Sequence, residues 1–194
     1  MTSFPRGFFA RLGPRFLRRY YRTFLDGPLA VALVVEVAGM PAGYLAGILD
    51  PAPHRRLLLA YHGLALATCG LLGLMRRPAV LAKFLVTRAR RYVVALLVRN
   101  HATVKHFAGP RLAVLSHVVV AKDCRGSGLG TVLVDAFLDH ARAAQRDRAC
   151  LVTIAGTGGA GEFYAKSGWT HIRDSTGVDG RRLSYYERDL HKVA

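Results

Sequence analysis

Acidic residues and cysteines are scarce in this chain of 194 residues. There are 12 Asp and Glu against 28 Lys and Arg, and the formal net charge of +16 favours anionic partners. The three cysteines, Cys69, Cys124 and Cys150, are widely spaced and form no CxxC pair. Histidines at the intervals of a zinc site are also lacking. These shortages indicate a reduced intracellular protein, and we expect no bound metal.

Two further absences narrow the class of protein. No helix-turn-helix, zinc finger or other nucleic-acid module is recognisable, so we do not expect nucleic acid as a partner on charge alone. Residues 1–24 carry arginines throughout and lack an apolar core followed by small residues, so they do not resemble a signal peptide. We therefore expect a cytoplasmic protein. Its 52% hydrophobic and 21% charged residues fit a single folded domain over 1–194.

The distribution of apolar residues predicts an α/β (α+β) fold. Residues 14–25 repeat apolar side chains at intervals of three and four, which indicates an amphipathic helix started by Pro14. Two apolar runs, 29–37 and 42–49, are joined by a Gly/Pro turn and indicate a β-hairpin. Beyond residue 110, strands and helices alternate and end in a second hairpin. The expected strands are 111–121, 149–155, 169–173 and 182–190, and the expected helices are 128–145 and 159–167.

A glycine-rich loop follows the apolar strand that ends at Val120. Gly126, Gly128 and Gly130 let the backbone turn sharply and bring its amides close to a ligand. The helix that begins there adds unpaired N–H donors and a partial positive charge, and Arg125 adds a cation. Together these features predict a pyrophosphate cradle. The spacing is neither the GxGxxG of a Rossmann fold nor a P-loop, so an ordinary strand-to-helix turn stays open as an alternative.

The sequence resembles the GNAT superfamily of N-acetyltransferases in two motifs. RGSGLG at 125–130 resembles the R/Q-x-x-G-x-G/A motif that binds the pyrophosphate of acetyl-CoA. AGEFYAKSGW at 160–169 resembles the A-x-x-F-Y-x-x-x-G-[FW] segment of the same family, in the same order and at the same spacing. The resemblance covers 111–174 and, loosely, 28–50. It implies a mixed, central twisted sheet flanked by helices, with acetyl-CoA as co-substrate and no metal.

Carried over residue by residue, the resemblance implies a strand edge that pairs with pantetheine and a loop whose amides hold the pyrophosphate. The cofactor-binding residues would be Val118, Val119, Val120, Arg125, Gly126, Ser127, Gly128, Leu129, Gly130 and Thr131. Tyr164 matches the family's tyrosine that protonates the departing CoA thiolate, and a core tyrosine packed against Phe163 is the alternative. Thr157 stands where the family often has Asn, so its hydroxyl replaces a hydrogen bond to pantetheine or that bond is lost.

The group that takes the proton from the amine stays open between His117, Glu36 and solvent. Strand alternation puts Ser116 and Val118 on one face and His117 on the other, so Ser116 or His117 should face substrate. Cys124 has no base near it in sequence, and we do not expect it to act as a nucleophile. The leading function is acetyl transfer from acetyl-CoA to a primary amine of a small molecule or protein. The alternatives are a non-catalytic acyl-CoA-binding module and a membrane-associated enzyme acting on a lipid-linked amine.

Residues 51–110 differ from the rest of the chain, because they hold ten Lys and Arg and no Asp or Glu. We interpret them as a helical insertion between the third and fourth family strands, and we expect the first family strand to be missing. Leu57–Met75 carries no charge and is long enough to span a membrane, and a second helix is expected at 79–98. Since the strands flanking the insertion are neighbours in the resembled fold, a packed lid is favoured. In-plane contact with anionic membrane and a homodimer stay open.

Overall fold

The computed structural model describes residues 13–25, 27–75, 82, 111–156, 160–177 and 180–191. The chain divides into two compact units. The sheet unit comprises 24–54 and 107–194. The basic unit comprises 1–23 and 55–106, and its sequence contains no Asp or Glu. A single domain over the whole chain stays a prediction.

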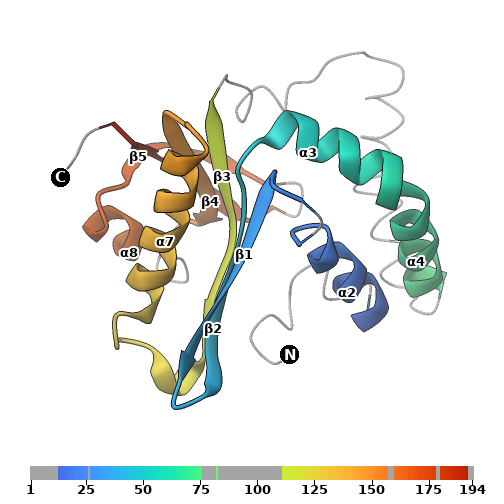
Figure 1. Cartoon of the computed structure of the whole chain (residues 1–194), viewed down its shortest axis with the longest axis horizontal. Helices are drawn as coiled ribbons and strands as arrows, with labels where there is room; N and C mark the ends of the chain where they lie inside the picture. The colour runs from blue at the N-terminus through green and yellow to red at the C-terminus, as the bar shows by residue number, and fades with distance from the viewer. Residues whose placement is uncertain are drawn as a thin grey trace. The chain divides into compact units, whose positions relative to one another are not determined.

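The sheet unit is built on a six-stranded mixed sheet in the order β1-β2-β3-β4-β6-β5 (Figure 1). Neighbouring strands are antiparallel except for β3 and β4, which run parallel. The strands are β1 (Ala30–Val37), β2 (Met40–Ile48), β3 (Leu112–Val120), β4 (Arg148–Ile154), β5 (Thr170–Thr176) and β6 (Arg182–Asp189). The predicted mixed sheet is therefore confirmed, and all six predicted strands are present.

Two helices, α7 (Leu129–Ala143) and α8 (Gly161–Lys166), cover one face of this sheet (Figure 1). The apolar residues of α7 recur on one side of the helix, which gives it a continuous stripe to bury against the strands. The buried residues of α7 are Leu133, Val134, Phe137, Leu138 and Ala141. They form one cluster with β2, β3 and β4, and Tyr164 of α8 belongs to the same cluster. This core fixes both helices on the sheet.

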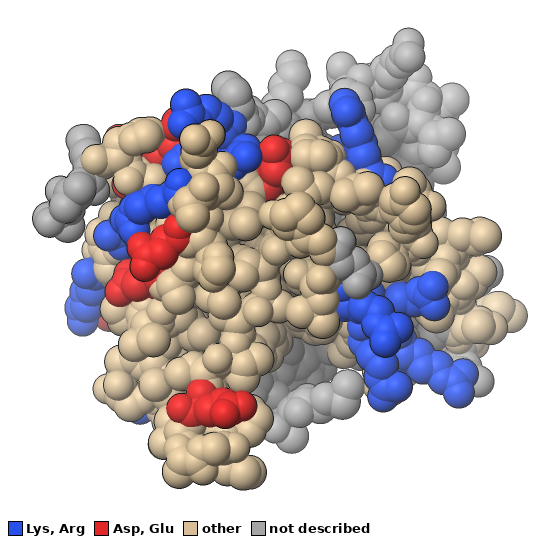
Figure 2. All heavy atoms as spheres, in the orientation of Figure 1, with Lys and Arg blue, Asp and Glu red and all other residues tan. Residues whose placement is uncertain are grey.

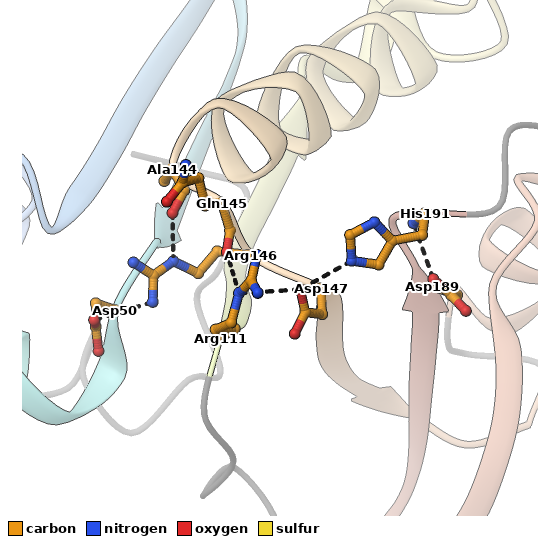
Figure 3. A network of polar contacts seen from close by, with 8 residues as sticks. All are labelled: Asp50, Arg111, Ala144, Gln145, Arg146, Asp147, Asp189 and His191. Carbon is orange, nitrogen blue, oxygen red and sulfur yellow. Dashed lines mark hydrogen bonds and ion pairs between the residues drawn. The ribbon is translucent and has the colours of Figure 1, made fainter.

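A polar network secures the C-terminal end of α7 (Figure 3). Arg146 Nη1 lies 3.1 Å from Asp50 Oδ2, just after β2. Arg111 Nε lies 3.1 Å from Asp147 Oδ1, and His191 Nε2 contacts the same carboxylate oxygen at 2.9 Å. These contacts join the connection between α7 and β4 to the ends of three strands. The network thus anchors the C-terminal end of α7 to the sheet.

The other helices begin with α2 (Pro14–Arg22), where Pro14 occupies the first turn and the side chain of Phe16 is buried. A second helical segment runs without a break through α3 (Pro51–Leu57), the π-helical turn η1 (Leu58–His62) and α4 (Gly63–Met75). Both helices were predicted, although the second begins six residues before the expected start. The predicted helix 79–98 lies outside the described residues, apart from residue 82.

The packed lid favoured from the sequence predicted burial of Leu57–Met75 against 79–98, which lies outside the described residues apart from residue 82, and the large apolar side chains of Leu57–Met75 are not uniformly buried. Several of them have between 40% and 82% of their surface exposed. They are Leu57, Leu59, Tyr61, Leu64, Leu72 and Met75. Across the part of the chain that the structure describes, no helix has both the length and the apolar character needed to cross a bilayer.

Candidate active site

The parallel strands β3 and β4 separate part of the way along the sheet. They pair over four residue pairs, and the last pair is Leu115 with Leu151. Beyond it, β3 continues to Val120 paired with β2 alone, while β4 continues to Ile154 paired with β6 alone. We call the gap between them the wedge. Backbone N–H and C=O groups of β3 that point into the wedge have no partner strand among the described residues, so an extended ligand with amide groups can pair with them.

A β-bulge lies at the narrow end of the wedge. The register between β2 and β3 shifts at Ser116, which is an extra residue on β3. Leu115 and Val118 consequently both contact the core under α7, although they are three residues apart. The alternation predicted for 116–118 therefore does not extend back to Leu115. It holds for His117, which follows the bulge and lies on the opposite face from Val118.

The loop between β3 and α7 is held by two hydrogen bonds to its own backbone. It starts with the 3-10 turn η4 (Lys122–Cys124). The Ser127 hydroxyl donates to the carbonyl of Cys124 at 2.6 Å, and Arg125 Nε donates to the carbonyl of Val120 at 3.4 Å. Arg125 is exposed, and its bond to Val120 keeps the guanidinium beside the end of β3. A permanent cation at this position favours an anionic ligand.

Two glycines give the loop its backbone path. Gly126 has φ of 80° and Gly128 has φ of 84°, which L side chains rarely adopt. Gly128 is the N-cap of α7, and its carbonyl accepts the amide of Thr131 at 2.9 Å. The amides of Leu129 and Gly130 are first-turn donors without an acceptor inside the helix. Since the first turn of α7 carries no acidic residue, these donors and the helix dipole suit a phosphate.

Tyr164 lies on α8, whose neighbouring residue Phe163 packs against the first turn of α7. A Cβ atom at Gly130 would lie 3.4 Å from Cζ of Phe163. The Tyr164 ring is buried, with its centroid 5.1 Å from Phe163, 5.8 Å from Trp169 and 6.1 Å from Tyr186. Burial raises the pKa of Tyr164 to about 12, so the hydroxyl keeps its proton at neutral pH. None of the described residues hydrogen-bonds this hydroxyl.

His117 lies on the face of the sheet turned away from α7. Phe24 covers it, with the two ring centroids 6.3 Å apart and the rings at 65°. Phe24 also contacts His54, whose centroid is 5.7 Å away. Burial lowers the pKa of His117 below its usual 6.5. The imidazole is therefore neutral at physiological pH and can accept a proton.

The structure does not bring Glu36 and His117 together. Glu36 is exposed on the edge strand β1 and pairs with Pro41 of β2, whereas His117 pairs with Ala46. Five residues along a strand correspond to about 17 Å. Glu36 therefore lies well away from His117, at the end of the sheet where β1 and β2 are joined. Thr157 lies outside the described residues.

A polar cluster on the β5–β6 hairpin was not predicted. Asp174 Oδ1 accepts a hydrogen bond from the Ser184 hydroxyl at 2.7 Å and contacts His171 Nε2 at 2.8 Å. The bond from Ser184, and then that from His171, lowers the pKa of Asp174. Because Ser184 donates to the carboxylate and not to the imidazole, the cluster lacks the Ser–His bond of a nucleophile pair. The sequence does not predict this cluster, because Asp174 and Ser184 are brought together only by the register between β5 and β6.

Solved structures that are similar to this chain include acetyltransferases. The chain is similar to an aminoglycoside 6'-N-acetyltransferase complexed with coenzyme A, at 10% identity and a TM-score of 0.53, covering 90% of this chain and 80% of that one. An aminoglycoside 6'-acetyltransferase type Ii matches at 12% identity and 0.52, covering 96% and 88%. Ard1 from Thermoplasma volcanium matches at 15% identity and 0.52, covering 91% and 78%. These structures share the fold of this chain.

The particular family follows from the sequence. A family described as "Acetyltransferase (GNAT) domain" matches residues 77–190, which is more than half of the chain. The chain therefore belongs to the GNAT acetyltransferase family, and the resemblance noted from its two motifs is confirmed. A comparison with curated proteins found no match. Within the described residues, no group of three or more His, Cys, Asp or Glu could hold a metal ion.

Proposed function

We propose that this chain transfers the acetyl group of acetyl-CoA to a primary amine of a small molecule or a protein, by direct attack of the amine. The observation that carries the proposal is the wedge between β3 and β4, which opens at the end of β3 that leads into the glycine loop. A ligand with an extended amide-containing arm and a diphosphate matches this combination of strand edge and helix start.

The residues present fit acetyl-CoA. The first-turn amides of α7 and the exposed Arg125 would hold the diphosphate, and Val118–Val120 would pair with the pantetheine arm. Gly126 and Gly128 leave open space around the loop, since a Cβ at either position would meet no atom within 4 Å. A diphosphate can therefore approach the backbone closely. Bound acetyl-CoA would supply the acetyl group as an activated thioester.

Proton transfer divides between the two faces of the sheet. His117 lies on the face away from α7 and is neutral, so it can take the proton that the amine loses on attack. Tyr164 belongs to the core on the α7 face and keeps its proton, so it can protonate the sulfur that leaves. The amine and the thiol would thus approach the wedge from opposite sides. No covalent acetyl–protein intermediate is required.

An acetyl-CoA thiol-release screen over a panel of amines tests the proposal. Each amine is paired with the corresponding alcohol, and the product mass is measured for every acceptor that releases thiol. We expect acetylated amines and no acetylated alcohols. The Gly128→Leu variant serves as the control that separates enzymatic release from spontaneous hydrolysis. Transfer to alcohols alone, or binding of acetyl-CoA without transfer to any acceptor, would contradict the proposal.

A further inference from the structure

The whole net charge of the protein belongs to the basic unit. Its sequence, 1–23 and 55–106, contains 16 of the 28 Lys and Arg and none of the 12 Asp and Glu. The sheet unit keeps the other 12 Lys and Arg together with all 12 Asp and Glu, so its formal net charge is zero. The acetyl-CoA site lies in the neutral unit. Binding of the CoA phosphates therefore does not account for the excess positive charge.

The same unit exposes an apolar stripe along the helical segment α3–η1–α4. Leu57, Tyr61, Leu64, Leu72 and Met75 follow one another at helical spacing and are exposed by 40% to 82%. Thr68, which occupies the gap in this series, bonds its hydroxyl to the carbonyl of Ala65 at 3.1 Å, inside the helix. No charged residue occurs from residue 57 to residue 75, a length of about 28 Å. A stripe of this kind marks a contact surface.

Exposed cations accompany the stripe. Four arginines of α2, namely Arg15, Arg18, Arg19 and Arg22, are exposed. In Figure 2, Lys and Arg gather over α2, and the neighbouring area over α4 is uncharged. The two helices are in contact with each other. The basic unit therefore offers a cationic area and an apolar area that adjoin.

We propose that this surface binds an anionic lipid membrane in the plane of the interface, with the stripe of α3–η1–α4 among the acyl chains and the α2 arginines against the lipid headgroups. A lipid surface with negative headgroups satisfies both areas at once. Nucleic acid would neutralise the arginines but leave the stripe in water. A second copy joined through this surface would bring two strongly positive units together. The observations thus favour lipid over either of these partners.

Co-sedimentation of the full chain with vesicles tests the proposal. Phosphatidylcholine vesicles are compared with vesicles that also contain phosphatidylglycerol, at low salt and at about 0.15 M, where screening shortens the range of surface charges to about 8 Å. We expect binding only to the anionic vesicles and weaker binding at the higher salt. Replacing Arg18 and Arg19 by Ser should lower the partition coefficient about thirtyfold. Replacing Leu64 and Leu72 by Ser should lower it at least about tenfold.

Matched controls come from the sheet unit. Val34→Ser with Met40→Ser removes two exposed apolar side chains, and Lys166→Ser with Arg181→Ser removes two exposed cations. Both control pairs should bind vesicles like the wild type. Circular dichroism establishes that every variant is folded. Thiol release without vesicles should be unchanged in the Arg18/Arg19 and Leu64/Leu72 variants, so a failure of lipid binding is distinguishable from a failure of the proposed acetyl transfer.

Three results would overturn the lipid proposal. The first is equal partition of wild type and the Leu64/Leu72 variant. The second is tighter binding to a nucleic-acid duplex than to anionic vesicles, with no effect of the Leu64/Leu72 change. The third is a dimer in solution that dissociates when Leu64 and Leu72 are replaced, while vesicle binding is absent. The second result points to nucleic acid, and the third to a second copy of this chain.

Discussion

Gly130 and Phe163 lie close together and link the two motifs that carry the family resemblance. A Cβ atom at Gly130 would lie 3.4 Å from Cζ of Phe163, so the first turn of α7 and the helix that carries Tyr164 are close neighbours. A substitution in the glycine loop can therefore disturb Tyr164 as well as the ligand. Variants at this site need separate measurements of cofactor affinity and of turnover.

Replacing Gly128 by Leu should abolish acetyl-CoA binding. Gly128 has φ of 84° at the N-cap of α7, and a side chain there would force the loop out of the backbone path that forms the proposed diphosphate site. Gly180 provides a matched control, because its φ is 78° and a Cβ there also meets no atom within 4 Å. Gly180→Leu should lose a similar amount of stability, about 1–2 kcal/mol, and keep its affinity. Calorimetric titration with unchanged affinity in Gly128→Leu would contradict the predicted cradle.

Replacing Tyr164 by Phe should lower kcat by about 10²-fold while the dissociation constant of acetyl-CoA stays nearly constant. The ring is retained and still fills its place between Phe163 and Trp169, so only the proton donor is lost. Tyr186→Phe, in the same aromatic cluster, serves as the control and should keep its turnover. If both variants turn over like the wild type, Tyr164 is a packing residue and the proton comes from solvent.

The acidic limb of the kcat/KM profile should report His117. Burial lowers its pKa below 6.5, so the neutral form that accepts a proton is fully present at pH 7 and is lost only as pH falls through this lowered value. His117→Asn should remove that limb and lower kcat/KM by about 10²-fold. A Glu36→Gln variant should leave both the limb and the rate unchanged. An acidic limb that persists in His117→Asn would assign it to another group.

The same shift has a consequence for stability, with a defined sign. The unfolded chain protonates His117 near 6.5, whereas the folded chain resists protonation until a lower pH. Folding stability contributed by the neutral imidazole is therefore present above 6.5 and is lost as pH falls below it. Chemical denaturation at a series of pH values gives the free energy of unfolding of the wild type and of His117→Asn. As pH falls below 6.5, the free energy of unfolding should decrease in the wild type relative to the variant.

Gly47 should not tolerate even a methyl group. A Cβ there would overlap the ring of Phe137 of α7, which is fully buried against the sheet. Gly47→Ala should destabilise the protein by about 1–3 kcal/mol through overpacking. Gly63→Ala is the opposite case, since its Cβ meets no atom closer than 3.9 Å within a helix, and it should stabilise by about 0.5–1 kcal/mol. Thermal unfolding of the two variants compares them directly, and equal shifts would contradict this packing.

Much of the sheet unit was predictable because its signals are local. The apolar runs of the strands, the stripe of α7 and the glycine loop each need only neighbouring residues, and the structure confirms these elements. The bulge at Ser116 was not predictable, since it arises where Gly47 of β2 accommodates Phe137 of α7. Cover of His117 by Phe24 and the distance from Glu36 depend on pairing between distant segments. Exposure of the 57–75 stripe could not be inferred from its apolar composition, which fits a buried helix equally well.

The early end of β3–β4 pairing makes the sheet mechanically discontinuous. Within the described strands, β1–β2–β3 and β4–β6–β5 are joined edge to edge by only four residue pairs. The two halves should therefore open first along this line, and amides on the wedge side of 116–120 should exchange with solvent faster than those bonded to β2. A pantetheine arm lying in the wedge would act as an additional strand between the halves. Acetyl-CoA would then slow exchange along the whole line and make the two halves unfold as one cooperative block.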